Sequence, residues 1–585
     1  MMIIRKFTGI AAAFVMLAGA LSGCGPKDGD YCLRVLTTND LHGSLFDSTY
    51  VDGNVKNSLF AVKWYVDSVR SAAGEDNVLL LDDGDFLQGD NSVYYFNYVD
   101  TLTPHIFPRM ASYMGYDVVV GGNHDIETGH RVYDRVAADL EAAGIPFLAG
   151  NAIRNDNGEP YFPYYTILKR AGLKVAVLGY DNANIAAWLN ESLWSGMTFK
   201  SLIPLVQENV DEVIARENPQ VVVVAVHSGT GRGDGSVLES QGLDLFNSLH
   251  GVDVLVCAHD HAPFVVTKDG HCLVNSGSHA RNLGYAEVNL TVSGGKVVSK
   301  SATSSLIRVD RKRADKAMSE AFHKDYEAVK AFTLREVGEL KADLRTRDSF
   351  SGMCPYINLI QTISLQSTGA QISFAAPLSF NSTVKAGTLV YNDLFTIYPY
   401  ENQIYLMSLC GAEIQKYLEY SYDLWIQSPA SGHVLKIKDR PDPRTGTVRW
   451  SFVERSYNFD SAAGINYTVD VTKPAGQRVQ ITSLADGTPF NAGTIYKVAM
   501  TSYRAAGGGG HLPQGVGLTS EQIEKRTLDK FPEIRNLLYD YLQTNGSIDP
   551  EVVGDPSVIG SWSFVPEKTV RPLLEKDMKL MFDRN

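Results

Sequence analysis

Runs of consecutive apolar residues recur through the first half of the chain. The clearest is Val78-Leu79-Leu80-Leu81, and others span residues 118–120, 175–178, 221–226 and 252–256. Because polar residues do not alternate with the apolar ones, the runs predict β-strands that are covered on both faces. Between the runs, apolar residues recur at helical spacing, as at Leu59, Val62, Val66 and Val69 and at Val132, Val136 and Leu140. The pattern predicts an α/β fold, with helices layered on a sheet, over residues 31–310.

The pattern changes after residue 310. Residues 311–340 are charged and helix-prone and predict a linker helix between two domains; a solvated surface helix of one domain is the alternative. Residues 341–545 mix helical and strand patterns, which predicts a separate α+β domain. The tail, residues 546–585, is expected to pack back on that domain as a strand or a helix. A chain of 585 residues also exceeds what one hydrophobic core usually holds.

Composition narrows the class of protein. Hydrophobic residues make up 44% of the chain and charged residues 20%, which are ordinary values for a globular protein. The formal net charge of -13 lacks the basic excess that binding of a DNA or RNA backbone requires, so polymeric nucleic acid is not an expected partner. Mononucleotides are not excluded, because a metal site can supply positive charge.

The N-terminus has the pattern of an export signal. Arg5 and Lys6 precede an apolar stretch that ends in Leu21-Ser22-Gly23-Cys24, which resembles a bacterial lipoprotein signal. Residues 1–23 are then expected to be removed and Cys24 to carry a lipid, which predicts a cell-envelope protein attached to a membrane by its lipid anchor. An uncleaved transmembrane helix is the alternative, but the stretch is shorter than the ~20 residues that a span needs.

Five strand-like runs are followed at once by residue types that bind metals. In chain order, these are Asp40-Leu41-His42, Asp82-Asp83-Gly84-Asp85, Gly121-Gly122-Asn123-His124-Asp125, His227 and Ala258-His259-Asp260-His261. Groups beyond the carboxyl ends of neighbouring strands converge on one crevice in an open α/β sheet. Carboxylates, imidazoles and an amide together suit two divalent ions such as Zn, Mn or Fe. Each motif alone is more often a loop, a turn or a core histidine, but five in order at strand ends favour a joint metal site.

These motifs resemble those of a known family. The chain is similar to the calcineurin-like metallophosphoesterases in Asp40-x-His42, Gly84-Asp85, Gly122-Asn123-His124, His227 and His259-x-His261. With its large C-terminal domain, it resembles the bacterial 5'-nucleotidase and 2',3'-cyclic phosphodiesterase branch. The resemblance implies an N-terminal layered α/β metallophosphoesterase domain followed by a C-terminal α+β nucleotidase domain.

The resemblance also implies a ligand set. One ion would be held by Asp40, His42, Asp85 and His261, and the other by Asp85, Asn123, His227 and His259. Asp85 would bridge the two ions, because a carboxylate has two oxygens. Two ions ~4 Å apart lower the pKa of a shared water and hold the attacking and leaving oxygens in line, so that no covalent intermediate is needed.

His124 is implied as the residue that contacts the phosphoryl oxygens or the leaving group, as in the family's His–acid dyad. The family often has Asp three residues after that histidine, whereas this chain has Glu127, whose longer side chain is expected to orient the imidazole. Asp125 is either a competing partner of His124 or a surface carboxylate.

The C-terminal domain of such relatives stacks the nucleobase between two aromatic rings, and each stacked ring contributes about 1–3 kcal/mol. Tyr503, which is followed by several glycines, matches one of the two positions. Phe459 is the first choice for the other and Tyr457 the second. The alternative is that each ring is a buried core residue. This alternative is weaker for Tyr503, because adjacent glycines allow close approach of a ligand.

One segment of the sequence favours one of these two activities over the other. The 5'-nucleotidases typically carry Asn-x-Gly-Gly-x-Arg, whereas the corresponding segment here, Ser373-Phe374-Ala375-Ala376-Pro377-Leu378, has no arginine and is similar to 2',3'-cyclic-nucleotide 2'-phosphodiesterase/3'-nucleotidases. That activity is therefore the preferred prediction, with a 5'-nucleotidase or UDP-sugar hydrolase as the alternative. A non-catalytic nucleotide-binding lipoprotein is the alternative of another class, and the intact ligand set argues against it.

Overall fold

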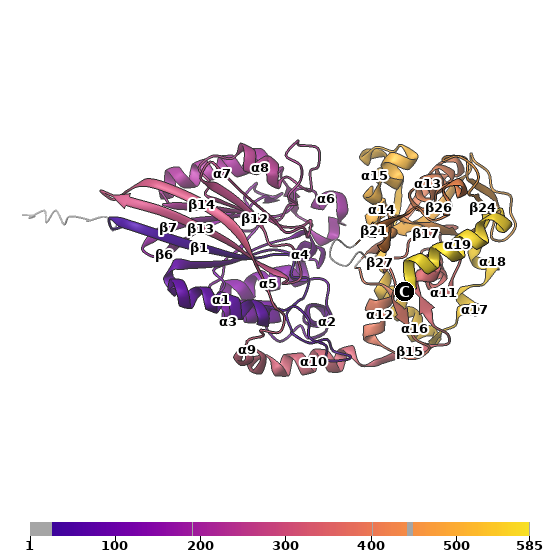
Figure 1. Ribbon diagram of the computed structural model, residues 1–585, viewed down its shortest axis with the longest axis horizontal. Coiled ribbons are helices and arrows are strands. Elements are labelled where there is room, and N and C mark those ends of the chain that lie inside the picture. Colours follow the sequence, from indigo (N-terminus) through magenta and orange to yellow (C-terminus); the bar gives the residue numbers. More distant parts are fainter. Residues whose placement is uncertain (1–25, 190, 401, 442–447, 584–585) are drawn as a thin grey trace, which may run out of the picture.

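The protein is described by a computed structural model over residues 26–189, 191–400, 402–441 and 448–583. The signal peptide predicted for residues 1–23 and the lipid attachment predicted at Cys24 lie outside these residues. Within them, no helix combines the length and the apolar character that crossing a bilayer requires. Figure 1 shows two lobes side by side, with the N-terminal half of the chain in one and the C-terminal half in the other.

The N-terminal domain is built on two six-stranded sheets. In spatial order, the first contains β14 (Lys296–Arg308), β13 (Asn282–Ser293), β1 (Gly29–Thr38), β2 (Val78–Asp83), β3 (Val118–Val120) and β4 (Phe147–Leu148). The second contains β11 (Phe264–Lys268), β12 (His271–Asn275), β10 (Val254–Cys257), β9 (Val221–Val226), β7 (Leu173–Tyr180) and β6 (Tyr165–Arg170). The helices that cover the outer faces are α1 (Leu59–Ala73), α3 (Ile106–Met114) and α5 (His130–Ala142) on the first sheet, and α7 (Leu202–Glu217) and α8 (Gly242–Ser248) on the second.

Both faces of each sheet are buried at its central strands. Val35 and Leu81 of the first sheet and Val223 of the second lie in the apolar layer between the sheets. The neighbouring residues Leu36 and Val224 point the opposite way, into the layers beneath the helices. This double coverage explains the unbroken apolar runs in the sequence, and it confirms the predicted layered α/β domain.

Parallel pairing aligns the strand ends that carry the predicted motifs. β1, β2 and β3 pair in parallel in one sheet, and β7, β9 and β10 do so in the other. The loops after β1, β2 and β3 therefore leave their sheet at one edge, as the loops after β9 and β10 leave theirs. The five predicted metal-binding motifs lie on these loops.

The helical connection between the domains ends earlier than the linker helix predicted over residues 311–340. It consists of two short helices, α9 (Lys316–Ala321) and α10 (His323–Thr333), which pack on the N-terminal domain. The next residues form β15 (Glu336–Leu340), which pairs with β19 (Gly387–Val390) of the second domain. Strand pairing outweighs the helical propensity of this part of the segment, because β-structure depends on the partner strand more than on local preference.

The C-terminal domain has a mixed five-stranded sheet at its centre. In spatial order, it contains β23 (Ser461–Ala463), β17 (Ile372–Ala375), β26 (Ile495–Thr501), β20 (Gln403–Cys410) and β27 (Thr527–Glu533). Helix α13 (Gly411–Trp425) packs on one face and α11 (Pro355–Thr368) on the other. Phe374 of β17 stacks on Tyr417 of α13 with ring centroids 4.0 Å apart, while its neighbour Ala375 faces α11.

The tail is part of this domain. Strand β29 (Gly560–Val565) pairs in parallel with β24 (Ile465–Asp470), and α19 (Glu567–Phe582) packs its apolar face into the same core. The C-terminal domain therefore extends from β15 to α19, beyond both ends of the predicted range 341–545, because the strands at each end pair within it.

Aromatic contacts join the two domains. Tyr94 of the N-terminal domain lies in a C-terminal core cluster, with its ring 5.7 Å from that of Tyr391 and 6.1 Å from that of Phe332. The guanidinium of Arg335 lies 4.4 Å from the Phe332 ring and 4.6 Å from the Tyr391 ring. In Figure 1, α4 (Asn123–Glu127), which follows β3, lies on the side of the N-terminal domain that faces the C-terminal domain.

Phe459, predicted as the first choice for a base-stacking residue, belongs to the core. Its side chain is fully buried and stacks on Trp425, with ring centroids 5.7 Å apart and planes 5° from parallel. Phe452 meets it edge-on at 5.0 Å. A short turn over residues 456–458 leaves Tyr457 exposed and turns Phe459 inward. The stacking prediction for Phe459 is therefore wrong, because no ligand reaches a ring enclosed on both sides.

This placement predicts unequal costs for two neighbouring substitutions. Phe459→Ala is expected to destabilise the C-terminal domain by about 3–5 kcal/mol, since it leaves a cavity beside Trp425. Tyr457→Ala, at a side chain that is 36% exposed, is expected to cost less than about 1 kcal/mol. Urea denaturation followed by tryptophan fluorescence measures both, and equal costs would contradict the core assignment.

Candidate functional site

Five of the seven predicted metal ligands have a left-handed backbone. Their φ angles are 47° at Asp40, 45° at His42, 59° at Asp85, 71° at His259 and 57° at His261. Residues other than glycine rarely adopt positive φ, and such strain persists only where the surrounding structure enforces it. Each loop therefore turns sharply at its strand end and keeps its side chain at the crevice between the sheets.

The first cluster of ligand atoms contains Asp40, His42 and His261. The Nε2 atoms of His42 and His261 lie 2.9 Å apart, and Asp40 Oδ1 lies 3.4 Å from His261 Nε2. His42 donates from Nδ1 to Gln88 Oε1 at 2.9 Å, which leaves the lone pair of Nε2 for an ion. Three potential ligand atoms thus converge from the loops after β1 and β10.

The second cluster contains Asp85, His227 and His259, and Asn123 adjoins it. His227 Nε2 lies 3.1 Å from Asp85 Oδ2, and His259 Nδ1 lies 2.9 Å from Asn123 Oδ1. His227 donates from Nδ1 to the carbonyl oxygen of Asp83 at 2.6 Å, so Nε2 is again the nitrogen with a free lone pair.

The two clusters fit a pair of divalent ions. They adjoin, since Asp40 Oδ1 lies 4.0 Å from His227 Nε2. Within the part of the chain that the structure describes, Asp85 Oδ2 and His227 Nε2 are buried and make no hydrogen bond. Buried polar atoms are normally hydrogen-bonded, and an exception points to an ion or another special role. The donor set suits Zn, Mn or Fe.

Burial and charge set the protonation of the imidazoles. Burial lowers the pKa of His42 to about 3 and that of His259 to about 4, so both are neutral at pH 7 and able to bind a metal. At His227 burial also acts to lower the pKa, but the adjacent Asp85 carboxylate raises it well above the ordinary value.

Two glycines let the loops after β2 and β3 meet. A Cβ atom on Gly84 would lie 2.7 Å from the backbone nitrogen of Gly122, and one on Gly122 would lie 2.4 Å from Asp85 Oδ1. No side chain fits at either position. The carboxylate of Asp125 holds the loops together, because it accepts the backbone N–H of Gly122 at 2.9 Å, that of Asp85 at 2.8 Å and those of the two following residues.

His124 and Glu127 are hydrogen-bonded on α4, one turn apart. His124 Nδ1 donates to Glu127 Oε2 at 2.5 Å, so the longer glutamate side chain reaches the imidazole. The backbone N–H of His124 donates to Asp85 Oδ1 at 2.8 Å, which fixes the histidine beside the clusters. Asp125 is neither a partner of this imidazole nor a surface group, because it is fully buried and bound to backbone amides.

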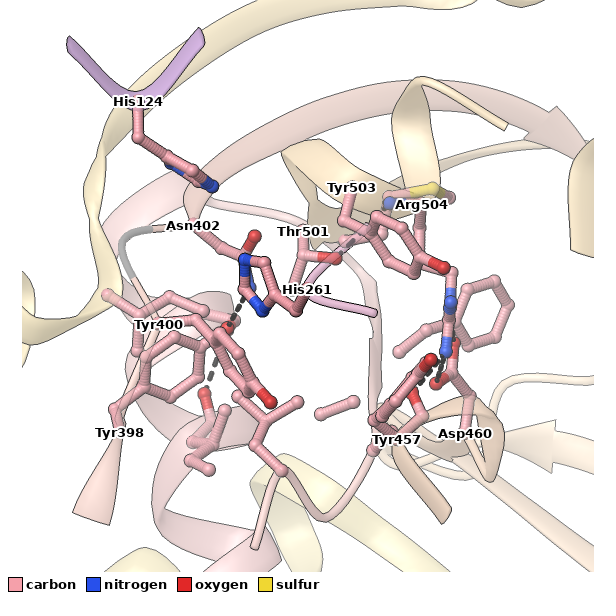
Figure 2. A pocket seen from close by; sticks show the side chains of 18 residues that line it. His124, His261, Tyr398, Tyr400, Asn402, Tyr457, Asp460, Thr501, Tyr503 and Arg504 are labelled. Carbon is pink, nitrogen blue, oxygen red and sulfur yellow. Dashed lines mark hydrogen bonds and ion pairs between the residues drawn. The ribbon is translucent and has the colours of Figure 1, made fainter. Parts of the chain in front are cut away.

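A cavity of about 390 Å³ lies between the metal-bearing edge and the C-terminal domain. His124 and His261 line it from the N-terminal domain, and residues of the C-terminal domain form the rest (Figure 2). Tyr457 and Tyr503 line one side, with ring centroids 6.4 Å apart and planes at 81°. Figure 2 shows Tyr400 on the opposite side. His124, the predicted ligand His261 and the exposed aromatic rings therefore line one cavity.

A fixed ion pair closes the cavity on the C-terminal side. Arg504 Nε and Nη2 donate to the two carboxylate oxygens of Asp460 at 2.8 and 2.9 Å, and both side chains are buried. Arg504 also donates to the carbonyl oxygen of Tyr457 at 2.6 Å. Among the described residues that line the cavity, Arg504 is the only arginine or lysine. Its charge is balanced by Asp460, and it acts to hold the Tyr457 loop.

His279 and Tyr400 are among the side chains at the site that were not predicted. His279 lies with its ring centroid 5.3 Å from that of His42, and its backbone N–H donates to the carbonyl oxygen of Asp40 at 2.8 Å. His279 follows the end of β12. It therefore fits the pattern that identified the five motifs, in which residue types that bind metals follow a strand. Tyr400 gave no comparable signal, because an aromatic residue in a loop is as often buried as exposed.

Family comparisons agree with the two-domain architecture. The calcineurin-like phosphoesterase model matches residues 33–263, and the model of the 5'-nucleotidase C-terminal domain matches residues 336–514. The trifunctional nucleotide phosphoesterase protein YfkN of Bacillus subtilis is 23% identical over 91% of this chain, which spans 39% of that protein. The 2',3'-cyclic-nucleotide 2'-phosphodiesterase/3'-nucleotidase of Haemophilus influenzae is 22% identical, with 96% of this chain and 92% of that protein covered.

Solved structures share the fold across both domains. The putative 5'-nucleotidase of Staphylococcus aureus has a TM-score of 0.72 at 18% identity, and the match covers 91% of this chain and 99% of that one. The two family models together match more than half of the 585 residues. The chain therefore belongs to the calcineurin-like phosphoesterases that carry a 5'-nucleotidase C-terminal domain, and it is a phosphoester hydrolase.

Proposed function

We propose that this hydrolase is a 2',3'-cyclic-nucleotide 2'-phosphodiesterase with 3'-nucleotidase activity. Water would attack the phosphorus of the cyclic diester, the bond from phosphorus to O2' would break, and O2' would take up a proton to give the 3'-phosphate. A second hydrolysis at the same site would release the nucleoside. The observation that carries the proposal is the single cavity that joins the metal-bearing edge to exposed aromatic rings.

The size of the cavity favours a mononucleotide. At about 390 Å³, it lies near the lower end of the ~300–1,000 Å³ range of ligand sites, which leaves little room for the second sugar of a nucleotide sugar. A 2',3'-phosphate sits on the ribose ring itself, close to the base. His261 at the metal edge and Tyr503 line the same cavity, which suits that arrangement.

The charge of the cavity favours a phosphodiester. A 5'-monophosphate carries about -1.5 to -2 charges at pH 7, whereas a cyclic diester carries one. The cationic side chain of Arg504 is already paired with Asp460, and Leu378 lines the cavity at the position that corresponds to the arginine of the 5'-nucleotidase motif. The activity of the Haemophilus influenzae relative, as its name states it, also supports this choice of substrate.

The reaction would use the described side chains as follows. Asp40, His42, Asp85 and His261 would hold one divalent ion, and Asp85, Asn123, His227 and His259 the other. Such ions, when bound, activate water and stabilise the charge that develops on the phosphoryl oxygens. His124 lines the cavity wall with Nδ1 hydrogen-bonded to Glu127, and it would contact a phosphoryl oxygen or donate a proton to the departing O2'.

A panel of substrates tests the proposal directly. The kcat/KM of the metal-loaded protein is expected to be highest for 2',3'-cyclic AMP, lower for 3'-AMP, and at least about tenfold lower for 5'-AMP and a UDP-sugar, a difference of about 1.4 kcal/mol. Phosphate release measures all four rates. A clear preference for 5'-AMP would overturn the assignment in favour of a 5'-nucleotidase.

The base-stacking role of Tyr503 has its own test. Tyr503→Ala is expected to weaken 2',3'-cyclic AMP binding by about 1–3 kcal/mol through KM, and to leave cleavage of a small aryl phosphate nearly unchanged. Gly508→Ala should act in the same direction, because its Cβ would lie 2.4 Å from the Tyr503 ring. Tyr113→Ala, at an exposed tyrosine of α3, and Gly493→Ala, where a Cβ has ordinary space, are the matched controls. An equal loss of kcat/KM for 2',3'-cyclic AMP and for the aryl phosphate would indicate that Tyr503 has a structural role.

The His124–Glu127 hydrogen bond predicts an effect on turnover. Glu127→Gln is expected to lower kcat by about 10²-fold with little change in KM, and to affect substrates with poor leaving groups more than aryl phosphates, because it weakens proton donation. Asp134→Asn is the matched control. Asp134 Oδ2 lies 3.0 Å from His130 Nδ1, and neither residue lines the cavity. Similar kcat values for the two variants would contradict the role of Glu127.

A further inference from the structure

The segment after β7 passes over the metal-bearing edge and ends in a short helix. Asn182, which is fully buried, donates from Nδ2 to the carbonyl oxygens of His227 and Glu239, each at 3.1 Å. These bonds tie the segment to the loop that carries a predicted ligand. Helix α6 (Ile185–Trp188) follows, on the side of the N-terminal domain that faces the C-terminal domain (Figure 1).

Trp188, the last residue of α6, stacks on the imidazole of His259. The ring centroids are 5.2 Å apart and the planes are 17° from parallel. The other ring contact of His259, with His227, is edge-on at 73°. Among the described residues, Trp188 is the one tryptophan whose ring contacts a predicted metal ligand, and its half-buried indole covers one face of that ligand.

Among the described residues, His259 lacks the orienting hydrogen bond that two neighbouring predicted ligands have. A metal-binding imidazole is normally oriented by a hydrogen bond from its second ring nitrogen. Gln88 serves this purpose for His42, and the carbonyl oxygen of Asp83 serves it for His227. His259 directs Nδ1 toward Asn123 Oδ1 at 2.9 Å, and its Nε2 makes no hydrogen bond within the described part of the chain. Its backbone is also strained, with φ at 71°.

We propose that Trp188 is the positioning residue for His259. The stacked indole replaces the missing hydrogen bond: it fixes the plane of the imidazole, keeps Nδ1 directed at the point shared with Asn123, and excludes water from that face. Trp188 acts through His259 and contacts no predicted ligand of the first cluster. The inference rests on the two-ion site of the proposed function, but not on the choice of nucleotide.

The proposal has a structural consequence for the ions. Loss of the indole would loosen only the ion held by Asp85, Asn123, His227 and His259. The ion held through His42 and His261 would keep its affinity, because these residues form the other cluster with Asp40, whereas Trp188 stacks on His259. The two ions, which otherwise share Asp85, would become distinguishable by affinity.

Titration of the metal-free protein with Co²⁺, followed by the visible absorption of the bound ion, tests this directly. The wild type is expected to bind two ions. In Trp188→Leu, one dissociation constant should rise about 10–100-fold, the cost typical of losing an outer partner of a ligand, and the other should stay within about twofold. Trp188→Phe should restore most of the affinity, because a smaller aromatic ring still stacks.

Trp64→Leu is the matched control, at a partly exposed tryptophan of α1 that lies beneath Arg313. It should bind both ions as the wild type does, and thermal unfolding checks that all variants are folded. Two unchanged dissociation constants in Trp188→Leu would overturn the proposal, and so would an equal loss at both sites. A wild type that binds two ions yet prefers 5'-AMP would refute the proposed substrate without touching this inference.

Discussion

The close approach of Gly84 and Gly122 is the constraint on which the rest of the site depends. Their backbones meet at distances that exclude any Cβ atom, and Asp85 follows directly from that contact with φ at 59°. The buried carboxylate of Asp125 secures the contact by accepting backbone N–H groups from both loops. Only with the two loops in contact does Asp85 reach His227 in the second cluster, where its carboxylate is predicted to serve both ions.

The remaining ligands follow from the sandwich. Parallel strands in two facing sheets bring loops from distant parts of the sequence to one edge, where Asp40 and His42 meet His259 and His261. The strained backbone at these positions costs free energy that the packed sheets beneath must offset. The aromatic contacts around Tyr94 and Arg335 then hold the C-terminal domain against this edge, which creates the cavity.

Much of this was predictable from the sequence. Unbroken apolar runs indicated strands that are buried on both faces, and polar motifs at their ends indicated a shared crevice, because both patterns follow from local periodicity and sheet geometry. Side chains whose surroundings come from distant segments were harder to predict. Phe459 and Tyr457 are two residues apart in similar surroundings, and only the packing of Trp425 and Phe452 decides which is buried. Trp188 lies in no motif, and its contact with His259 exists only in the folded domain.

The central claim is that Asp85 lies between two divalent ions that the strand-end loops hold. Anomalous diffraction from crystals of the Mn²⁺-loaded protein measures this most directly. The account predicts two peaks ~4 Å apart, one beside His42 and His261 and one beside His227 and His259, with a carboxylate oxygen of Asp85 within ~2.0–2.2 Å of each ion. A single peak, or two peaks that Asp85 does not join, would contradict it.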